Sequence, residues 1–285
     1  MAGDTAGMVD LFKENFDSAV RGIVLKNTIL KKDICTVQGS TAAEEHFYEE
    51  SVRELGSSTE IPKDAEFFAD NVEWTKTTIR PRKFGVETRL SWEDAIVNNV
   101  DIAKRTTIRM ANRIARDVDA RIWTIISESQ SPATIRTVAA NANWDHVTRS
   151  NRIPHEDVAS AKRQITDSEV QAYTPNTLLL SPLDAIYVLT NDYVLGSFDA
   201  SSPAVMSTGR LGTLLGLNVI EHPVVTDDYA MVLESKKCAT WKQVSDIKTE
   251  IIEDPGISKT LRAWEYGNVA LTDPKAVCLI TNTQA

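Results

Sequence analysis

The chain has 285 residues, with 31 Lys or Arg against 40 Asp or Glu, so its formal net charge is -9. Hydrophobic residues at 42% and charged residues at 25% are typical of a globular protein and exclude a wholly disordered chain. The acidic balance argues against salt-sensitive binding of nucleic acid over most of the surface, so any such contact is expected to be local.

Three cysteines, Cys35, Cys238 and Cys278, lie far apart and are odd in number. This excludes a disulfide framework and suits a reducing compartment. The first residues lack a basic segment followed by an apolar core, so no signal peptide is expected. No apolar run approaches the roughly 20 residues of a membrane-spanning helix. We therefore expect a soluble intracellular protein.

The N-terminal part, residues 1–58, is predicted to be an arm. Apolar residues recur near the helical period from Phe12 to Leu30, and the pattern is interrupted at Gly22. A second short helix is predicted from Thr41, because Thr41 and Glu44 have the spacing of a capping box. The apolar stripe of this arm is too narrow for it to fold alone, so we expect it to lie on another part of the assembly.

Residues 59–90 are predicted to form an extended loop. From Glu66 to Leu90 the apolar period changes to two, which is typical of strands. We interpret this stretch as one long two-stranded hairpin with its bend between Ile79 and Lys83. An isolated hairpin is marginally stable in water, so this one is expected to pack on a neighbouring subunit.

The clearest element is a long helix beginning at Ser91, a good N-cap residue. No Gly or Pro occurs from Trp92 to Ser127, which predicts a rod of roughly 50 Å. Its apolar stripe keeps spacings of three and four and consists of Ile96, Val100, Ala103, Thr107, Ala111, Ile114, Val118, Ile122 and Ile125.

Four arginines lie on the face of this helix opposite the apolar stripe: Arg105, Arg109, Arg113 and Arg116. A solvated helix face is the ordinary interpretation, and Asp101, Asp117 and Asp119 partly neutralise the arginines. We interpret the four arginines as lying along one line of the helix surface that contains no acidic residue. This arrangement favours a binding face. Its partner is either phosphate groups or the acidic cluster Glu44, Glu45, Glu49 and Glu50 of the arm.

The rest of the chain alternates between helices and strands without a regular repeat. Helices are predicted after Pro154 and from Pro182, and buried strands at Thr177–Ser181 and Tyr229–Leu233. A glycine turn from Gly209 to Gly216 leads into a further strand. The remaining strands are predicted at Leu217–Ile220, Thr249–Ile252, Ala263–Ala270 and Ala276–Thr281. The fold class is therefore α+β with one dominant helix.

No catalytic, metal or cofactor site is visible. The four histidines, His46, His146, His155 and His222, have no metal-ligand spacing. The glycines from Gly209 to Gly216 lack the Lys-Ser/Thr ending of a phosphate-binding loop. Asp227 and Asp228 are explained as well by a solvated turn as by a carboxylate pair.

The order of these elements resembles the major capsid proteins of tailed phages. The most specific stretches are FGVETRLSWE (residues 84–93), Trp144 followed by IPHEDVASA (153–161), TPNTLLLSP (174–182) and GTLLGLNVI (212–220). None is as specific as a metal motif, and the weight lies in their order along nearly the whole chain.

The resemblance implies a Hong Kong 97-type capsid fold with N-terminal arm, extended β-hairpin loop, long spine helix, and peripheral and axial domains. It implies an arm at 1–58, an extended loop at 59–90, a peripheral domain with the spine helix at 91–153, an axial domain at 154–245, and return strands to the peripheral domain at 246–285. Arg80, Arg82 and Lys83 then lie in the extended loop, as further candidates for contacts with subunits or DNA.

The function implied is self-assembly into hexamers and pentamers of an icosahedral shell around double-stranded DNA, in a virion capsid assembled in the host cytoplasm. Implied partners are the chain itself, a portal, a separate scaffolding protein, a possible decoration protein and weakly held DNA, with no membrane. Many relatives begin with a cleaved scaffolding segment that is not seen before this arm. Some relatives cross-link a loop lysine to an asparagine with a catalytic glutamate; Lys76, Lys83, Asn268 and Glu265 are present here, but no motif joins them, and we expect no cross-link.

Two other functions are weighed. An encapsulin, a cellular nanocompartment of the same fold, would hold an enzyme instead of a genome. An unrecognised soluble enzyme would need a deep polar pocket with perturbed ionisable groups, for which the sequence offers no residues.

Overall fold

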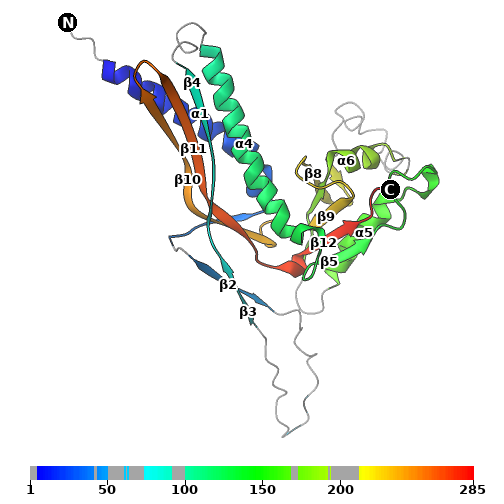
Figure 1. The fold of residues 1–285 in the computed structure, drawn as a ribbon. Helices are drawn as coiled ribbons and strands as arrows, with labels where there is room; N and C mark the ends of the chain where they lie inside the picture. Colours follow the sequence, from blue (N-terminus) through cyan, green and yellow to red (C-terminus); the bar gives the residue numbers. More distant parts are fainter. Residues whose placement is uncertain are drawn as a thin grey trace. The chain divides into compact units, whose positions relative to one another are not determined.

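The computed structural model describes residues 5–41, 44–50, 61, 63, 74–91, 100–167, 173–191, 193 and 212–285. The chain forms two compact units, each assembled from segments far apart in sequence (Figure 1). Unit 1 comprises Met1–Glu45, Ile79–Trp123 and Thr240–Ala270, and unit 2 comprises His46–Thr78, Thr124–Ala239 and Leu271–Ala285. Among the described residues, no helix is both long enough and apolar enough to cross a membrane.

Unit 1 contains a four-stranded sheet in the order β1-β10-β11-β4. The strands are β1 (Thr36–Gly39), β10 (Ala239–Asp254), β11 (Ser258–Leu271) and β4 (Arg82–Ser91). β1 runs parallel to β10, and β4 runs antiparallel to β11 with Ser91 opposite Ser258 and Arg82 opposite Gly267. The sheet therefore joins residues of the arm, the predicted loop and the C-terminal part of the chain.

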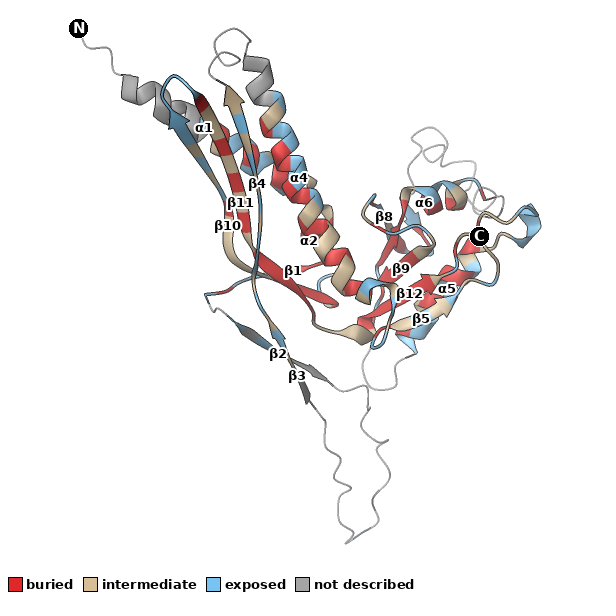
Figure 2. Ribbon diagram, viewed as in Figure 1, coloured by how far each residue is buried: buried red, intermediate tan, exposed pale blue. Residues whose placement is uncertain are grey.

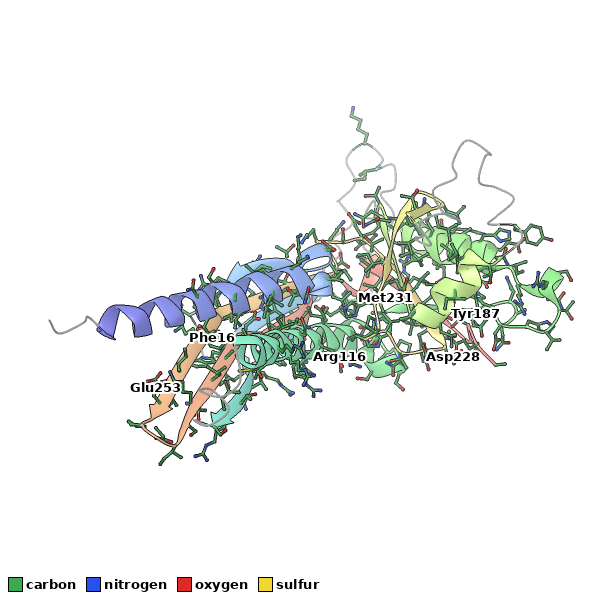
Figure 3. All side chains as sticks on the ribbon, turned by 90° about the horizontal axis from the view of Figure 1, so that it is seen from above. Phe16, Arg116, Tyr187, Asp228, Met231 and Glu253 are labelled. Carbon is green, nitrogen blue, oxygen red and sulfur yellow. The ribbon has the colours of Figure 1, made fainter. Side chains whose placement is uncertain are left out.

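The helices of unit 1 are α1 (Thr5–Asn27), α2 (Ile29–Asp33) and α4 (Val100–Ile126). The end of α1 meets α4 where Asn27 Nδ2 donates to Asn112 Oδ1, and Figure 3 labels Phe16 on α1 and Arg116 on α4. Along α4, buried positions recur between exposed ones (Figure 2), which confirms the predicted apolar stripe from Thr107 to Ile122. Ile125 is only half-buried and Ile126 is buried instead, and the side chains of Ile96, Val100 and Ala103 lie outside the described residues. The buried residues of α4 are Met110, Ala111, Ile114, Ala115, Val118, Ile122, Trp123 and Ile126, with Thr107 among the polar ones. Ser91, the predicted cap, is the last residue of β4, and residues 92–99 lie outside the described part.

Two glycines in unit 1 are required by tryptophans. A Cβ at Gly267 would lie 2.7 Å from the carbonyl oxygen of Lys242 and 3.0 Å from the ring of Trp241. A Cβ at Gly85 would lie 2.9 Å from the Cβ of Trp264, its partner across the β4–β11 ladder. These contacts are shorter than packed atoms tolerate, so a side chain at either position would force the neighbouring strand to shift.

Unit 2 contains a six-stranded mixed sheet in the order β5-β12-β9-β6-β8-β7. The strands are β5 (Arg136–Ala139), β6 (Thr177–Leu180), β7 (Thr213–Leu214), β8 (Leu217–Glu221), β9 (Tyr229–Leu233) and β12 (Val277–Thr281). All four residues of β6 are buried, as its continuous apolar run predicts. The strands predicted from Leu217 and Tyr229 are confirmed as β8 and β9.

Two helices of unit 2, α5 (Pro154–Thr166) and α6 (Pro182–Leu189), confirm the predictions from their prolines. At the start of α6, the Ser181 hydroxyl accepts a hydrogen bond of 3.1 Å from the Asp184 backbone N–H, and Pro182 takes the first helical position. The short 3-10 turns are η1 (Glu128–Gln130), η2 (Arg149–Asn151) and η3 (Pro274–Ala276).

Two predictions for the arm and loop are wrong. In place of a helix after Thr41, the structure has strand β2 (Glu45–Glu50), which pairs with β3 (Trp74–Ile79) in a two-stranded sheet. The predicted hairpin from Glu66 to Leu90 is also wrong, because β3 pairs with β2 and β4 pairs with β11. The period of two identified strands correctly, whereas their partners are distant in sequence and local spacing does not select them.

The C-terminal strand departs from the prediction as well. β12 pairs with β9 and β5 in the six-stranded sheet, not with β10 or β11. The strands predicted for 246–285 therefore lie in two different sheets. β5 also lies in unit 2, whereas the predicted boundary grouped it with the long helix.

Candidate functional surfaces

The four arginines predicted on the long helix are all exposed. Arg105, Arg109, Arg113 and Arg116 occupy one side of α4, and the side opposite is buried in unit 1. α4 rises by about 1.5 Å per residue, so guanidinium groups four residues apart repeat at about 6 Å along the helix. The structure thus presents a linear series of cations on a rigid element.

The nearby acids lie differently from the prediction. Arg113 Nε donates to Asp117 Oδ2 at 3.1 Å, so an acid does lie on the arginine line, contrary to the prediction. Asp119 is fully buried and accepts hydrogen bonds from the backbone N–H groups of Ile29 and Lys31, so it points toward α2. Within the described part of the chain, no carboxylate lies within ion-pair distance of Arg105, Arg109 or Arg116.

The acidic cluster of the arm has a different partner. Glu44 Oε1 accepts a hydrogen bond of 2.8 Å from Arg80 Nε, and both side chains are exposed. The side chains of Glu45, Glu49 and Glu50 lie outside the described residues. The one member whose contacts are described therefore binds Arg80 and not the arginines of α4.

The other basic candidates lie at the start of β4. Arg82 is exposed opposite Gly267 in the strand ladder. The Lys83 ammonium lies 4.9 Å from the ring centroid of Trp264, a cation–π geometry. Arg80, Arg82 and Lys83 are all solvent-accessible, and each has a different environment.

The centre of unit 1 contains a buried ion pair that the sequence analysis missed. The Lys31 ammonium on α2 donates to Glu265 Oε1 on β11, and both side chains are almost fully buried. The same ammonium lies 5.2 Å from the ring of Trp241. Lys31 follows Leu30 at the end of a helical pattern, and nothing in this spacing marks it as buried.

The glutamate and asparagine considered for a cross-link have other partners within the subunit. Glu265 lies beside Lys31 of the same chain, while Lys76 and Lys83 are exposed. Asn268 donates to the Arg80 carbonyl at 2.9 Å and accepts from Arg121 Nε at 3.1 Å, so both ends of its amide are engaged within the subunit.

Burial raises the pKa of the Glu265 carboxyl, and Lys31 acts in the opposite direction. Asp246 and Asp119 raise this pKa further, because each disfavours a second nearby negative charge. Glu265 Oε2 has no hydrogen-bond partner among the described residues. This centre is an ionic contact in the interior of unit 1.

Cys238, Cys278 and Asp157 are further buried ionisable groups in the described residues. No group of three or more His, Cys, Asp or Glu that could hold a metal occurs there. Burial raises the pKa of the Cys238 thiol to about 12 and that of Cys278 to about 12, so neither is a thiolate nucleophile near neutral pH. Burial also raises the pKa of Asp157, whose carboxylate accepts from Trp144 Nε1 at 2.9 Å.

A long helix beside a four-stranded sheet in one unit, with a six-stranded mixed sheet in the other, defines the Hong Kong 97-type class of shell-forming proteins. The chain belongs to the phage capsid protein family, whose model matches residues 74–280, well over half of its length. It is a major capsid protein, a structural subunit of an icosahedral shell, and neither a nanocompartment protein nor an unrecognised enzyme is favoured.

Solved capsid and particle structures share this fold. The chain is similar to the virus-like particle from Pyrococcus furiosus, with 12% identity, a TM-score of 0.65, and coverage of 94% of this chain and 99% of that chain. It is similar to the capsid of cyanophage P-SCSP1u, with 13% identity, a TM-score of 0.67, and coverage of 88% and 86%. It is also similar to the capsid of the native GTA particle, with 15% identity, a TM-score of 0.66, and coverage of 90% and 91%. No curated protein sequence matches it.

Proposed function

We propose that this capsid protein assembles into hexamers and pentamers that close a shell around a double-stranded DNA genome. The family match over residues 74–280 carries this proposal. The net charge of -9 supports it too, because an acidic wall does not bind tightly to DNA that has to be packed and released.

Exposed apolar side chains in both units support contacts between copies. Leu25 is 50% exposed, Ile186 54% and Ile257 60%, so each would lose water contact in an interface. These residues are scattered, and each offers a small area. Repeated over many identical subunits, weak contacts of this kind add to a stable closed particle.

Expression of the full chain, followed by size-exclusion chromatography and electron microscopy, tests the proposal. We expect capsomers or closed particles, and nuclease-protected DNA in particles from infected cells. A protein that elutes only as a monomer or dimer, at every concentration and salt tried, would contradict it.

We further propose that Arg105, Arg109 and Arg116 contact the phosphates of the packaged DNA. The absence of ion-pair partners for these three among the described residues supports the proposal, as does the pairing of Glu44 with Arg80. Guanidinium groups bind phosphate with two parallel hydrogen bonds, and spacing along α4 lets several act on one backbone. The contact is local and salt-sensitive, consistent with an overall acidic protein.

The double variant Arg109→Gln/Arg116→Gln tests this role against Arg149→Gln/Arg163→Gln, whose arginines are also exposed but lie outside α4. We expect normal particle yield, weaker DNA retention, and a salt dependence of DNA binding reduced by about 0.9 per lost phosphate contact. Loss of particles in the α4 variant alone would assign the arginines to assembly instead. A normal yield of particles together with normal DNA retention would show that these arginines act neither in DNA binding nor in assembly.

Other partners follow from the same shell function. We propose that a portal and a separate scaffolding protein act during assembly in the host cytoplasm, and that a decoration protein can bind the outer surface. Arg80, Arg82 and Lys83 are proposed as contacts to neighbouring subunits, because they are exposed at the end of the segment that leads from β3 into β4.

A further inference from the structure

The backbone that follows α4 adopts a left-handed turn without glycine. Glu128, Ser129 and Gln130 have φ angles of 46°, 55° and 62°. Such angles bring Cβ close to the backbone carbonyl and are unfavourable for L-residues. Elsewhere in the described part, non-glycine residues with positive φ occur singly. Three in succession therefore need a specific source of stabilisation.

The Glu128 carboxylate supplies that stabilisation. It accepts hydrogen bonds from the backbone N–H of Ala133, and from both the backbone N–H and the hydroxyl of Thr134. These bonds lower the pKa of Glu128 despite its partial burial, so the carboxylate is charged near neutral pH. Hydrogen bonds to a charged acceptor are stronger than neutral ones. We call this set of contacts the Glu128 clamp.

Two further contacts join the turn to its surroundings. Gln130 N donates to the Ser127 carbonyl at 2.8 Å, and Gln130 Nε2 donates to Thr226 Oγ1 at 2.8 Å. Ser129 Oγ lies 3.4 Å from the Thr124 carbonyl, in the last turn of α4. The clamp and these contacts all lie within unit 2.

The amino-acid sequence supports a second conformation of the same segment. Ser127 to Gln130 contains neither Gly nor Pro, and Glu and Gln have high helix propensity. The first residue that stops a right-handed helix is Pro132, which also disfavours helix at Ser131. A negative charge at the helix C-terminus opposes this continuation. A right-handed continuation therefore competes with the left-handed turn, and the clamp favours the turn.

We propose that the Glu128 clamp is a conformational switch at the end of α4. With the clamp formed, α4 ends at Ile126 and the left-handed turn follows. With the clamp released, α4 continues right-handed to about Gln130. Each residue added to the helix rotates the direction in which the chain leaves it by about 100° around the helix axis. One sequence then has two directions in which the chain leaves α4. Such a switch would let the same subunit fit both hexamers and pentamers, and this role rests on the shell function proposed above.

The full-length variant Glu128→Ala tests the switch, with Glu221→Ala, an exposed glutamate on β8, as the matched control. We expect hydrogen exchange at Ala133 and Thr134 to accelerate about tenfold or more, while exchange at residues 128–130 slows and the circular dichroism of helix increases. Adding Ser129→Gly to Glu128→Ala should reverse the gain of helix and the slower exchange at residues 128–130, because glycine adopts positive φ without strain and disfavours helix, while exchange at Ala133 and Thr134 stays fast.

Unchanged exchange at Ala133 and Thr134 in Glu128→Ala would overturn the proposal. Faster exchange throughout residues 127–134 without a gain of helix would also overturn it, since the clamp would then only hold a loop. Both readouts are made on dissociated subunits, so they stay separate from the shell function. If subunits switch but no shells form, the switch stands and the shell function fails.

Discussion

The Lys31 ammonium and the Glu265 carboxylate form an ion pair in the interior of unit 1, joining α2 to the middle of β11. Their side chains are 8% and 0% exposed, so neither is screened by water. The backbone N–H groups of Ile29 and Lys31 are bound in turn by Asp119 of α4. The middle of the arm is thereby attached to both the sheet and the long helix by polar contacts.

Removing one member of this pair should be more damaging than removing both. Lys31→Met leaves the Glu265 carboxylate buried without its cation, and we expect the free energy of unfolding to fall by about 3–5 kcal/mol. Lys31→Met/Glu265→Met replaces the pair by apolar side chains, and we expect stability within about 1–2 kcal/mol of the original. Urea unfolding of dissociated subunits, followed by circular dichroism, measures both. Equal losses in the single and double variants would contradict this account.

The Lys31→Met variant should also acquire a characteristic pH dependence. Burial already raises the pKa of Glu265, and removal of the opposing lysine raises it further. A carboxyl whose folded pKa exceeds its unfolded pKa favours the folded state below the unfolded pKa, and this stabilisation is lost as pH rises through the folded pKa. The deficit of Lys31→Met should therefore shrink as pH falls from neutral toward the unfolded pKa of a glutamate. A deficit that grows on acidification would show that Glu265 is not the group left unpaired.

Asp157 organises the segment before α5. Its carboxylate accepts from Trp144 Nε1 at 2.9 Å and from the backbone N–H and side-chain amide of Asn141 at 3.1 and 3.0 Å. Asp157→Ala leaves these donors unpaired, so we expect a loss of about 2–4 kcal/mol and a shifted Trp144 emission. Glu156→Ala, one position away on the same helix, should change neither quantity by more than about 0.5 kcal/mol. Similar losses in both variants would indicate a general effect on α5 instead.

Glycines in unit 1 should respond oppositely to alanine. Gly267→Ala forces a Cβ against the Lys242 carbonyl and the Trp241 ring, and we expect a loss of about 1–3 kcal/mol. Gly22 lies inside α1 with no atom within 4 Å of an added Cβ, so Gly22→Ala should raise stability by about 0.5–1 kcal/mol. Thermal unfolding of the two variants provides the comparison. A stabilising Gly267→Ala would show that the backbone at this position relaxes away from Trp241.

The cysteines should be unreactive in the folded protein. Cys35, Cys238 and Cys278 are buried and unpaired by disulfide, and burial raises the pKa of Cys238 and Cys278 to about 12. Thiol reagents require the thiolate, so we expect labelling by a chromogenic disulfide only after denaturation in guanidinium chloride. Rapid labelling of any thiol in native capsomers would identify a segment that opens locally.

The pattern of apolar and polar residues predicted those helices and strands whose formation depends on residues close together in the sequence. The apolar stripe of α4, the exposure of its arginines, the prolines that begin α5 and α6, and the buried run of β6 all depend on neighbours along the chain. The resemblance in the order of these elements gave the capsid family, and the match over residues 74–280 confirms it.

Tertiary structure decided what depends on distant partners. Strand pairing is set by burial and hydrogen bonding across the fold, so β2 pairs with β3, β4 with β11, and β12 with β9, against the predicted hairpin and return strands. The same applies to Lys31, which local spacing marked as the end of a helix and which Glu265, 234 positions later, makes part of the interior. The amino-acid sequence by itself determines which residues favour helix or strand; only the folded chain determines which of them meet, because contact energies between remote segments leave no periodic trace in either one.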